Sequence, residues 1–306
     1  MVKRAGAPGR RGQRRSRIWA RSLALTLGAA SLVGAYESGS LTVSAAAAQA
    51  KLDAAKLKKQ LESQDPAEIR EALEQVTKAG TAAKALVPTL NALLTRGTRA
   101  DLLPSLIEAT GRVEDVSSSA PLAPYLRHRT PAVRQAAVKA LSRTKGPEAI
   151  KALTRGLRSQ DAVVRGVSAS ALGDLGAKAA LPDLQRAFDQ KVLEAAVSIG
   201  QLCDGASCDE FLKRLGKVRF DVMTAGLDQM LFRPASSMKD EAKLNVVSRL
   251  RALGTAEASR YLTDVAGRWP KDYSARVKQA LEEAAKATSK GASAPSDDDE
   301  DEEDDE

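Results

Sequence analysis

One stretch of the chain decides the fold: residues 161–184 read DAVVRGVSASALGDLGAKAALPDL. Asp161 is a residue type preferred at the start of a helix, and the apolar residues after it recur at three- and four-residue spacing, as one buried helical stripe requires. A turn containing Gly173 and Gly176 ends this helix, and residues 181–188 carry the apolar stripe of a second one. The stretch therefore predicts two helices joined by a glycine-containing turn.

The same pattern recurs along the chain. Val164-Arg165 has a counterpart one repeat length earlier in Val133-Arg134, and another two repeat lengths before that in Ile69-Arg70. Forward along the chain, Leu253-Gly254 follows Ile199-Gly200 at a distance close to two repeat lengths. Recurrence at several independent positions indicates an internal repeat, which sets the architecture of the whole chain.

Each repeat carries the same local signals. Asp65-Pro66 and Thr130-Pro131 place a capping residue before a proline at the first helical position. Neither helix of a pair can cover its apolar stripe alone, so the pairs must stack. Alanine and leucine dominate the apolar residues, and aromatics make up only 3% of the chain, which favours helix over strand. We therefore expect an all-α fold, an α-solenoid of about seven stacked helix pairs over residues 51–290.

These repeats resemble the HEAT family, and specifically the short bacterial HEAT-like repeats also found in phycobilisome lyases. The resemblance covers most of residues 65–270 and is carried by Val164-Arg165, Ala171-Leu172-Gly173, Leu175-Gly176 and Pro182-Asp183-Leu184, and more weakly by residues 133–141. It implies a protein that binds or organises other proteins, and it carries no information about an activity.

The resemblance also implies a ladder of polar contacts, because an aspartate and an arginine of each HEAT unit often join successive repeats. The residues that match this pattern are Asp65, Arg70, Arg134, Asp161 and Arg165. Thr130 stands where the pattern has an aspartate, so we expect an interrupted ladder in the unit formed by residues 130–157.

The N-terminal fifty residues have the features of a secretory signal. Eight basic residues lie between positions 3 and 21, and the uncharged, largely apolar residues 22–36 follow them. Ala48-Gln49-Ala50 fits the small-x-small pattern of a cleavage site, with Ala46-Ala47-Ala48 as a nearby competitor. We expect residues 1–50 to be a signal peptide and the protein to be exported, to the periplasm or the exterior. The alternative is an uncleaved membrane anchor, although fifteen apolar residues are fewer than the ~20 that span a bilayer.

The C-terminal residues 297–306 are ten consecutive acidic side chains after a spacer rich in Gly, Ser and Pro. Such a run repels itself and cannot bury apolar surface, so we expect residues 291–306 to be a disordered tail. A solubilising role is the simplest. Weak binding of divalent cations and attraction of basic partners are alternatives, but the run lacks the ligand spacing of a preformed calcium loop.

The charge of the chain is unevenly distributed. The formal net charge of +8 includes eight bases and one acid in residues 1–50. Without that segment, a basic solenoid with 39 bases and 28 acids is joined to a tail of ten acids. Export explains the basic N-terminus, so no nucleic-acid partner is expected.

Another hypothesis is that the solenoid binds anionic surfaces, such as lipid headgroups, through exposed basic residues. Its candidate basic patch is Arg127, Arg129, Arg134, Arg143 and Lys145.

The two cysteines, Cys203 and Cys208, lie at the turn between the helices of the fifth unit. In an exported protein, a disulfide that clamps the helix pair is the favoured interpretation. Free thiols and a redox site are the alternatives, but a redox pair is typically Cys-x-x-Cys beside a βαβ unit.

Little in the sequence supports catalysis. One histidine and two cysteines cannot supply the four nitrogen or sulfur ligands of a structural zinc site. His128 lies in a basic loop between repeats, with no neighbour in sequence that could form a nucleophile–base pair. A chromophore pocket like that of a lyase would need more aromatic residues than this chain has. We therefore expect no enzyme, cofactor or metal site, but an exported scaffold of the cell envelope that binds a protein or peptide.

Overall fold

Helices joined by short loops make up residues 52–291, which are the residues that the computed structural model describes. The α-helices are α1 (Ala54–Leu61), α2 (Pro66–Ala79), α3 (Val87–Arg96), α4 (Leu103–Val113), α5 (Ser119–Leu122), α6 (Pro131–Thr144), α7 (Gly146–Gly156), α8 (Ala162–Asp174), α9 (Leu181–Asp189), α10 (Ala195–Leu202), α11 (Gly205–Leu212), α12 (Phe220–Leu231), α13 (Asp240–Leu253), α14 (Ala256–Arg268) and α15 (Ala275–Gly291). Four 3-10 segments accompany them: η1 (Gly80–Leu86), η2 (Val116–Ser118), η3 (Ala123–Arg127) and η4 (Lys178–Ala180). Within this range there is no strand, only an isolated bridge between Leu215 and Val218.

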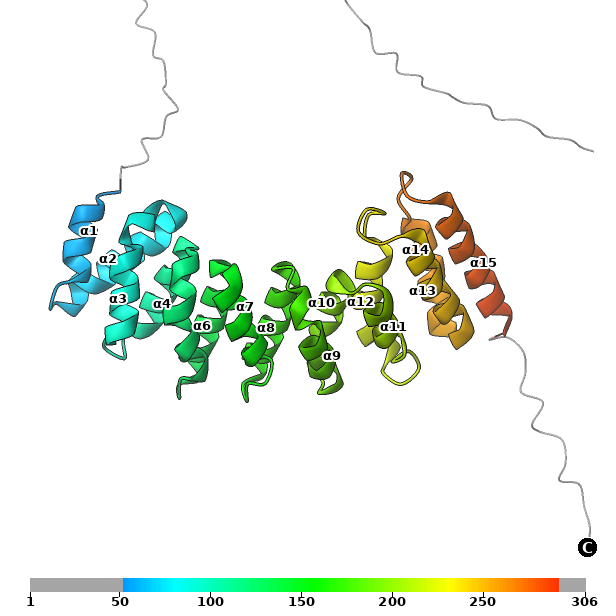
Figure 1. Cartoon of the computed structure of the whole chain (residues 1–306), viewed down its shortest axis with the longest axis horizontal. Helices are drawn as coiled ribbons and strands as arrows, with labels where there is room; N and C mark the ends of the chain where they lie inside the picture. The colour runs from blue at the N-terminus through cyan, green and yellow to red at the C-terminus, as the bar shows by residue number, and fades with distance from the viewer. Residues whose placement is uncertain (1–51, 292–306) are drawn as a thin grey trace, which may run out of the picture. The chain divides into compact units, whose positions relative to one another are not determined.

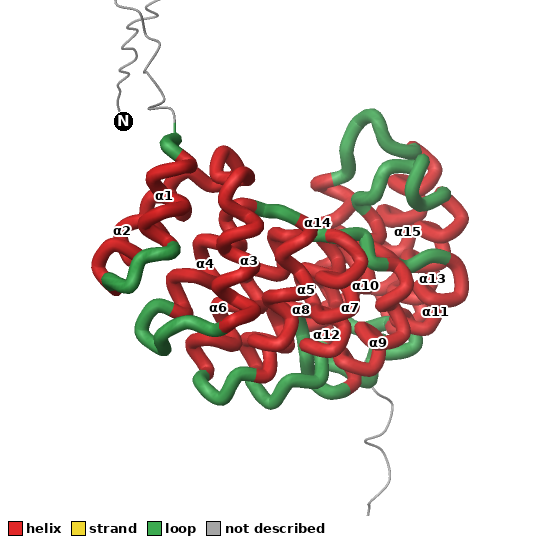
Figure 2. The backbone as a smooth tube through the Cα atoms, turned by 60° about the vertical axis from the view of Figure 1, so that its left-hand side comes forward, coloured by secondary structure: helices red, strands yellow, loops and turns green. Residues whose placement is uncertain are grey.

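The helices alternate between two rows. Row A consists of the even-numbered helices α2 to α14, and row B of the odd-numbered helices α3 to α15, so that each row-A helix and the next helix form one unit (Figures 1 and 2). Counted this way, the described residues contain seven units, from unit 1 (α2 and α3) to unit 7 (α14 and α15), with α1 before them. The prediction of an all-α solenoid is confirmed.

Two edges of the solenoid follow from this alternation, because successive helices run in opposite directions. The loops that join one unit to the next all lie on one side, along the bottom of Figure 1, and we call this side the inter-unit edge. It includes residues 128–130, 213–219 and 254–255. The turns within units form the opposite, intra-unit edge. Since α15 belongs to row B, its C-terminal end lies on the inter-unit edge.

Row A is closely packed because glycines stand where its helices meet. A Cβ atom added at Gly200 in α10 would lie 2.2 Å from the carbonyl oxygen of Gly226 in α12. One added at Gly226 would lie 2.6 Å from the carbonyl oxygen of Ala196, and one at Gly111 in α4 would lie 2.6 Å from the Cα of Ala140 in α6. No larger side chain fits at these positions without moving backbone. In units 1 to 6, the row-A helices accordingly pack more closely on one another than the row-B helices do.

A continuous apolar core runs between the rows, from Leu57 in α1 to Ala285 in α15. Its character changes along the chain, since aromatic contacts occur in the later units, such as the edge-on contact of Phe220 with Tyr261, whose ring centroids lie 5.6 Å apart. These contacts help to explain why the repeat motif weakens after residue 192 although helix pairs continue to stack.

The start of α6 differs from the sequence-based prediction. The Asp65 and Asp161 carboxylates cap α2 and α8 as expected, accepting hydrogen bonds from the backbone N–H groups of Ala67 at 2.8 Å and Val163 at 3.0 Å. The Thr130 side chain makes no capping bond. Its own backbone N–H instead donates to Nδ1 of His128, at 3.1 Å.

The predicted signal peptide and acidic tail lie outside the described residues, and both stay predictions. Within residues 52–291, no helix is long and apolar enough to cross a lipid bilayer.

Candidate functional site

An ion pair joins units 3 and 4. The Arg134 guanidinium donates to the Asp161 carboxylate at 3.0 Å, and the two side chains are only 20% and 7% exposed. Arg134 also donates to the carbonyl oxygens of His128 and Arg129, each at 3.0 Å. One arginine therefore holds the loop before its own helix and the first turn of the next row-A helix.

A similar contact links units 1 and 2, but it is exposed. Arg70 donates to Asp101 at 3.2 Å, and Arg99 reaches the same carboxylate at 3.1 Å. Asp101 was not among the residues predicted for the ladder. The sequence spacing could have identified Asp101 as the partner of Arg70, since Asp101 follows Arg70 by about one repeat length, much as Asp161 follows Arg134.

The ladder is interrupted at Thr130, as the sequence suggested, because no ion pair among the described residues joins α4 to the start of α6, and it is interrupted again after α8. Asp65 caps only its own helix. Arg165 donates to the carbonyl oxygens of Ser159 and Gln160, at 2.8 and 3.1 Å, and has no carboxylate partner among residues 52–289. Arg70 and Arg134 each reach forward to an aspartate at the start of the next row-A helix. The residue that precedes α10 is Glu194, and its carboxylate lies at Gly166 and forms no ion pair with Arg165.

The surroundings of Asp161 favour its charged form. Burial opposes ionisation, but hydrogen bonds from Gln135, from the backbone N–H of Val164 and from Arg134 outweigh it, and the pKa of Asp161 lies below its ordinary value. An aspartate with a lowered pKa stabilises the fold above the pKa that it has when unfolded, and this contribution is lost as the pH falls through the folded-state pKa.

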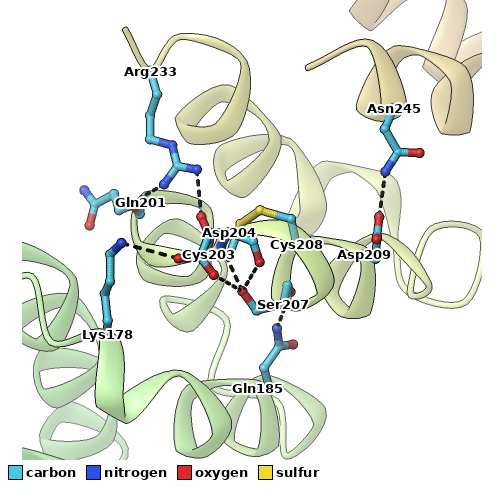
Figure 3. The surroundings of a disulfide bond; sticks show 10 residues. All are labelled: Lys178, Gln185, Gln201, Cys203, Asp204, Ser207, Cys208, Asp209, Arg233 and Asn245. Atoms are coloured by element: carbon cyan, nitrogen blue, oxygen red, sulfur yellow. Dashed lines mark hydrogen bonds and ion pairs between the residues drawn. A yellow bond between two sulfur atoms is a disulfide. The ribbon is translucent and has the colours of Figure 1, made fainter. Parts of the chain in front are cut away.

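Cys203 and Cys208 form a disulfide, with their Cα atoms 5.0 Å apart, between α10 and α11 (Figure 3). Both side chains are buried. The loop between them closes on itself, because the backbone N–H of Asp204 donates to the Ser207 hydroxyl at 2.8 Å. The disulfide therefore fixes the turn within unit 5.

Neighbouring units contact this turn from both sides (Figure 3). From α9, the Gln185 side chain donates to the carbonyl oxygen of Ser207 at 3.0 Å. From the loop after α12, Arg233 donates to the carbonyl oxygens of Gln201 and Cys203, at 2.6 and 2.7 Å, so that it closes the C-terminal end of α10. Burial lowers the pKa of Arg233. The disulfide turn is thus a junction of units 4, 5 and 6, which the sequence did not indicate.

The candidate basic patch is not one patch. Arg127 and Arg129 lie at the inter-unit edge, before α6, whereas Arg143 and Lys145 lie at the other end of this helix. A helix rises about 1.5 Å per residue, so the fourteen residues of α6 separate the two groups by about 20 Å. Arg134 forms an ion pair with Asp161 and is largely buried, so it does not add an exposed charge to either group.

A groove opens on the outer side of row A in units 3 to 5. It has a volume of about 360 Å³ and is lined by Ser142, Val163, Gly166, Val167, Ser170 and Ala171. Val163 is 43% exposed, and Leu193, next in sequence to the lining residue Glu194, is 47% exposed. Small side chains thus form the floor of the groove, and exposed apolar side chains stand beside it.

Two acidic residues, Asp174 and Glu194, also line the groove. Neither forms an ion pair with a residue in the described part of the chain. Glu194 lies across α8 at Gly166, where an added Cβ would come within 2.6 Å of its Oε1 atom. The groove therefore combines a floor of small side chains with two carboxylates that have no basic partner among the described residues. The sequence showed the exposed positions of α8 as part of a helix but gave no sign of a groove.

No cluster of three or more His, Cys, Asp or Glu side chains that could hold a metal ion occurs within residues 52–289.

The Asp161 contacts lead to a test with a matched control. Asp161→Ala removes the cap of α8 and the partner of Arg134, so we expect it to lower the free energy of unfolding by about 1–2 kcal/mol at pH 7. Thr130→Ala changes the equivalent position of α6, where the side chain caps nothing, and should have little effect. Chemical denaturation at pH 7 and pH 3 measures both. The difference between wild type and Asp161→Ala should shrink at pH 3, and a difference that is the same at both pH values would refute the assigned role.

Comparisons with known proteins bear on the fold. The family described as HEAT repeats matches residues 101–173 and 119–199. No curated protein matches the chain significantly. Among solved structures, the complex of CpcE and CpcF of phycocyanin lyase from Nostoc sp. PCC7120 is 18% identical, with a TM-score of 0.43 over 78% of this chain and 97% of that one. A designed armadillo repeat protein is 14% identical, with a TM-score of 0.38 over 76% and 98%. Human deoxyhypusine hydroxylase is 14% identical, with a TM-score of 0.35 over 78% and 97%. The family match covers residues 101–199, which form α4 to α10 of the stacked helix pairs, and over this range the chain resembles HEAT-repeat proteins.

Proposed function

We propose that this protein is an exported, non-catalytic scaffold of the cell envelope that binds a protein or peptide partner through its HEAT repeats. The observation that carries the proposal is the groove on row A of units 3 to 5, because it exposes Val163 and Leu193 beside a floor of small side chains. Apolar side chains that stand out beside a concave surface are typical of binding sites.

The chemistry of the groove indicates what kind of segment it binds. Its floor of glycine, serine and alanine lets a partner's backbone or short apolar side chains come close to α8. Asp174 and Glu194 have no basic partner among the described residues, and a lysine or arginine of the partner would supply one. The proposed ligand is therefore a peptide segment with small apolar residues next to a basic side chain.

The export of the protein is supported by the sequence of residues 1–50. If the signal is cleaved after Ala50, the intact mass of the protein purified from its natural source will equal that of residues 51–306. A mass that includes residues 1–50 would contradict cleavage and favour the membrane-tethered alternative.

The groove is tested by replacing its exposed apolar side chains. We expect Val163→Ser combined with Leu193→Ser to weaken capture of partners from an envelope extract by about tenfold, because each replacement removes part of an apolar contact. Val116→Ser is the matched control, since Val116 is 53% exposed but lies on η2, away from the groove lining. The amount of each captured protein is compared between variants by quantitative mass spectrometry.

The contribution of the two groove carboxylates to partner binding is tested separately. Asp174→Asn with Glu194→Gln keeps the shape of the groove and should reduce capture, more at low than at high salt. Capture that is unchanged in both groove variants, or reduced equally by Val116→Ser, would show that the partner binds elsewhere.

A further inference from the structure

Exposed basic side chains that form no ion pair within the described residues collect at the inter-unit edge of units 5 to 7. They are Lys217 in the loop before α12, Arg249 and Arg251 at the end of α13, Arg260 near the start of α14 and Lys286 near the end of α15. None of them forms an ion pair with another residue between positions 52 and 289. They come from several elements, which the fold brings to the same edge.

Most acidic residues at this edge already have basic partners. Glu210 pairs with Lys213 at 2.9 Å, and Asp221 pairs with Arg219. Glu257, near the start of α14, interacts electrostatically with the same Arg219. These carboxylates therefore leave the five basic side chains unneutralised, and an additional source of negative charge would be favoured at the edge.

The chain itself carries such a source. Helix α15 ends at Gly291 on the same edge, and the ten acidic residues 297–306 follow after five intervening residues. An extended chain spans at most about 3.3–3.6 Å per residue, so the intervening residues reach about 17 Å and the acidic run about 35 Å further. Neighbouring helices in a stack lie about 8–10 Å apart. The acidic run can therefore reach past the α13–α14 loop to Lys217.

We propose that the acidic tail, residues 297–306, binds the inter-unit edge of units 5 to 7 in the same molecule, along Lys217, Arg249, Arg251, Arg260 and Lys286. Each exposed ion pair contributes little by itself. Several pairs formed by a tethered segment benefit from its high effective concentration, and together they hold the tail at the edge. The bound tail covers the basic side chains, and an acidic ligand must displace it.

The position of the tail is measured by zero-length cross-linking of carboxylates to lysines in the full chain with a carbodiimide, followed by peptide mass spectrometry. Lys239 and Lys271 are the control lysines, because both are exposed in units 6 and 7 but lie at the intra-unit edge. At low salt, we expect links from the tail to Lys217 and Lys286 to exceed those to Lys239 and Lys271 by about fivefold or more, with the preference lost at about 0.5 M salt.

Charge reversal identifies the side chains that hold the tail. Arg249→Glu with Arg251→Glu should reduce the links to Lys217 by about tenfold while the circular dichroism spectrum stays unchanged. Arg143→Glu with Lys145→Glu, at the intra-unit edge of unit 3, is the matched control and should leave the links unchanged. Equal yields at Lys217 and Lys271 would overturn the proposal. So would links that form only between molecules, since the tail would then bind a second copy of the chain.

Discussion

The close approach of neighbouring row-A helices is the constraint on which the rest of the structure depends. At Gly111, Gly200 and Gly226 the backbone of one helix lies where a Cβ of the other would stand. Since no side chains intervene, the helices contact each other through backbone and small groups. Ser198 adds a buried hydrogen bond to the carbonyl oxygen of Ala169 at 2.7 Å. This spacing sets the register in which units 1 to 6 stack on one another.

The two candidate interaction surfaces follow from this arrangement. Because α8 has small residues on its outward side as well, its surface is hollow between α6 and the start of α10, and Val163 and Leu193 stand beside the hollow. The alternation of helices brings every connection between units to one edge, where basic side chains from distant parts of the sequence accumulate. The groove therefore depends on the packing of row A, whereas the basic inter-unit edge depends only on the order and direction of the helices.

The sequence predicted the architecture well because the signals are local and repeated. Capping residues, glycine turns and the apolar period all occur within a single repeat, and the HEAT resemblance rests on the same positions. The long-range details were harder to predict. Asp101 was missed as the partner of Arg70, and the contacts of Gln185 and Arg233 with the disulfide turn depend on how the units stack. The prediction that the basic residues form one patch was wrong, because Arg129 and Arg143, although close in sequence, lie at opposite ends of α6.

The free energy of unfolding of Gly200→Ala, compared with Gly267→Ala, tests the role of row-A packing most directly. Both glycines lie within helices, but a Cβ at Gly267 meets no atom within 4 Å, whereas one at Gly200 lies 2.2 Å from backbone. Helix propensity alone would make both changes stabilising, by up to about 1 kcal/mol. We predict that Gly267→Ala is neutral or stabilising and that Gly200→Ala destabilises by about 1–3 kcal/mol. A Gly200→Ala variant as stable as Gly267→Ala would contradict the account.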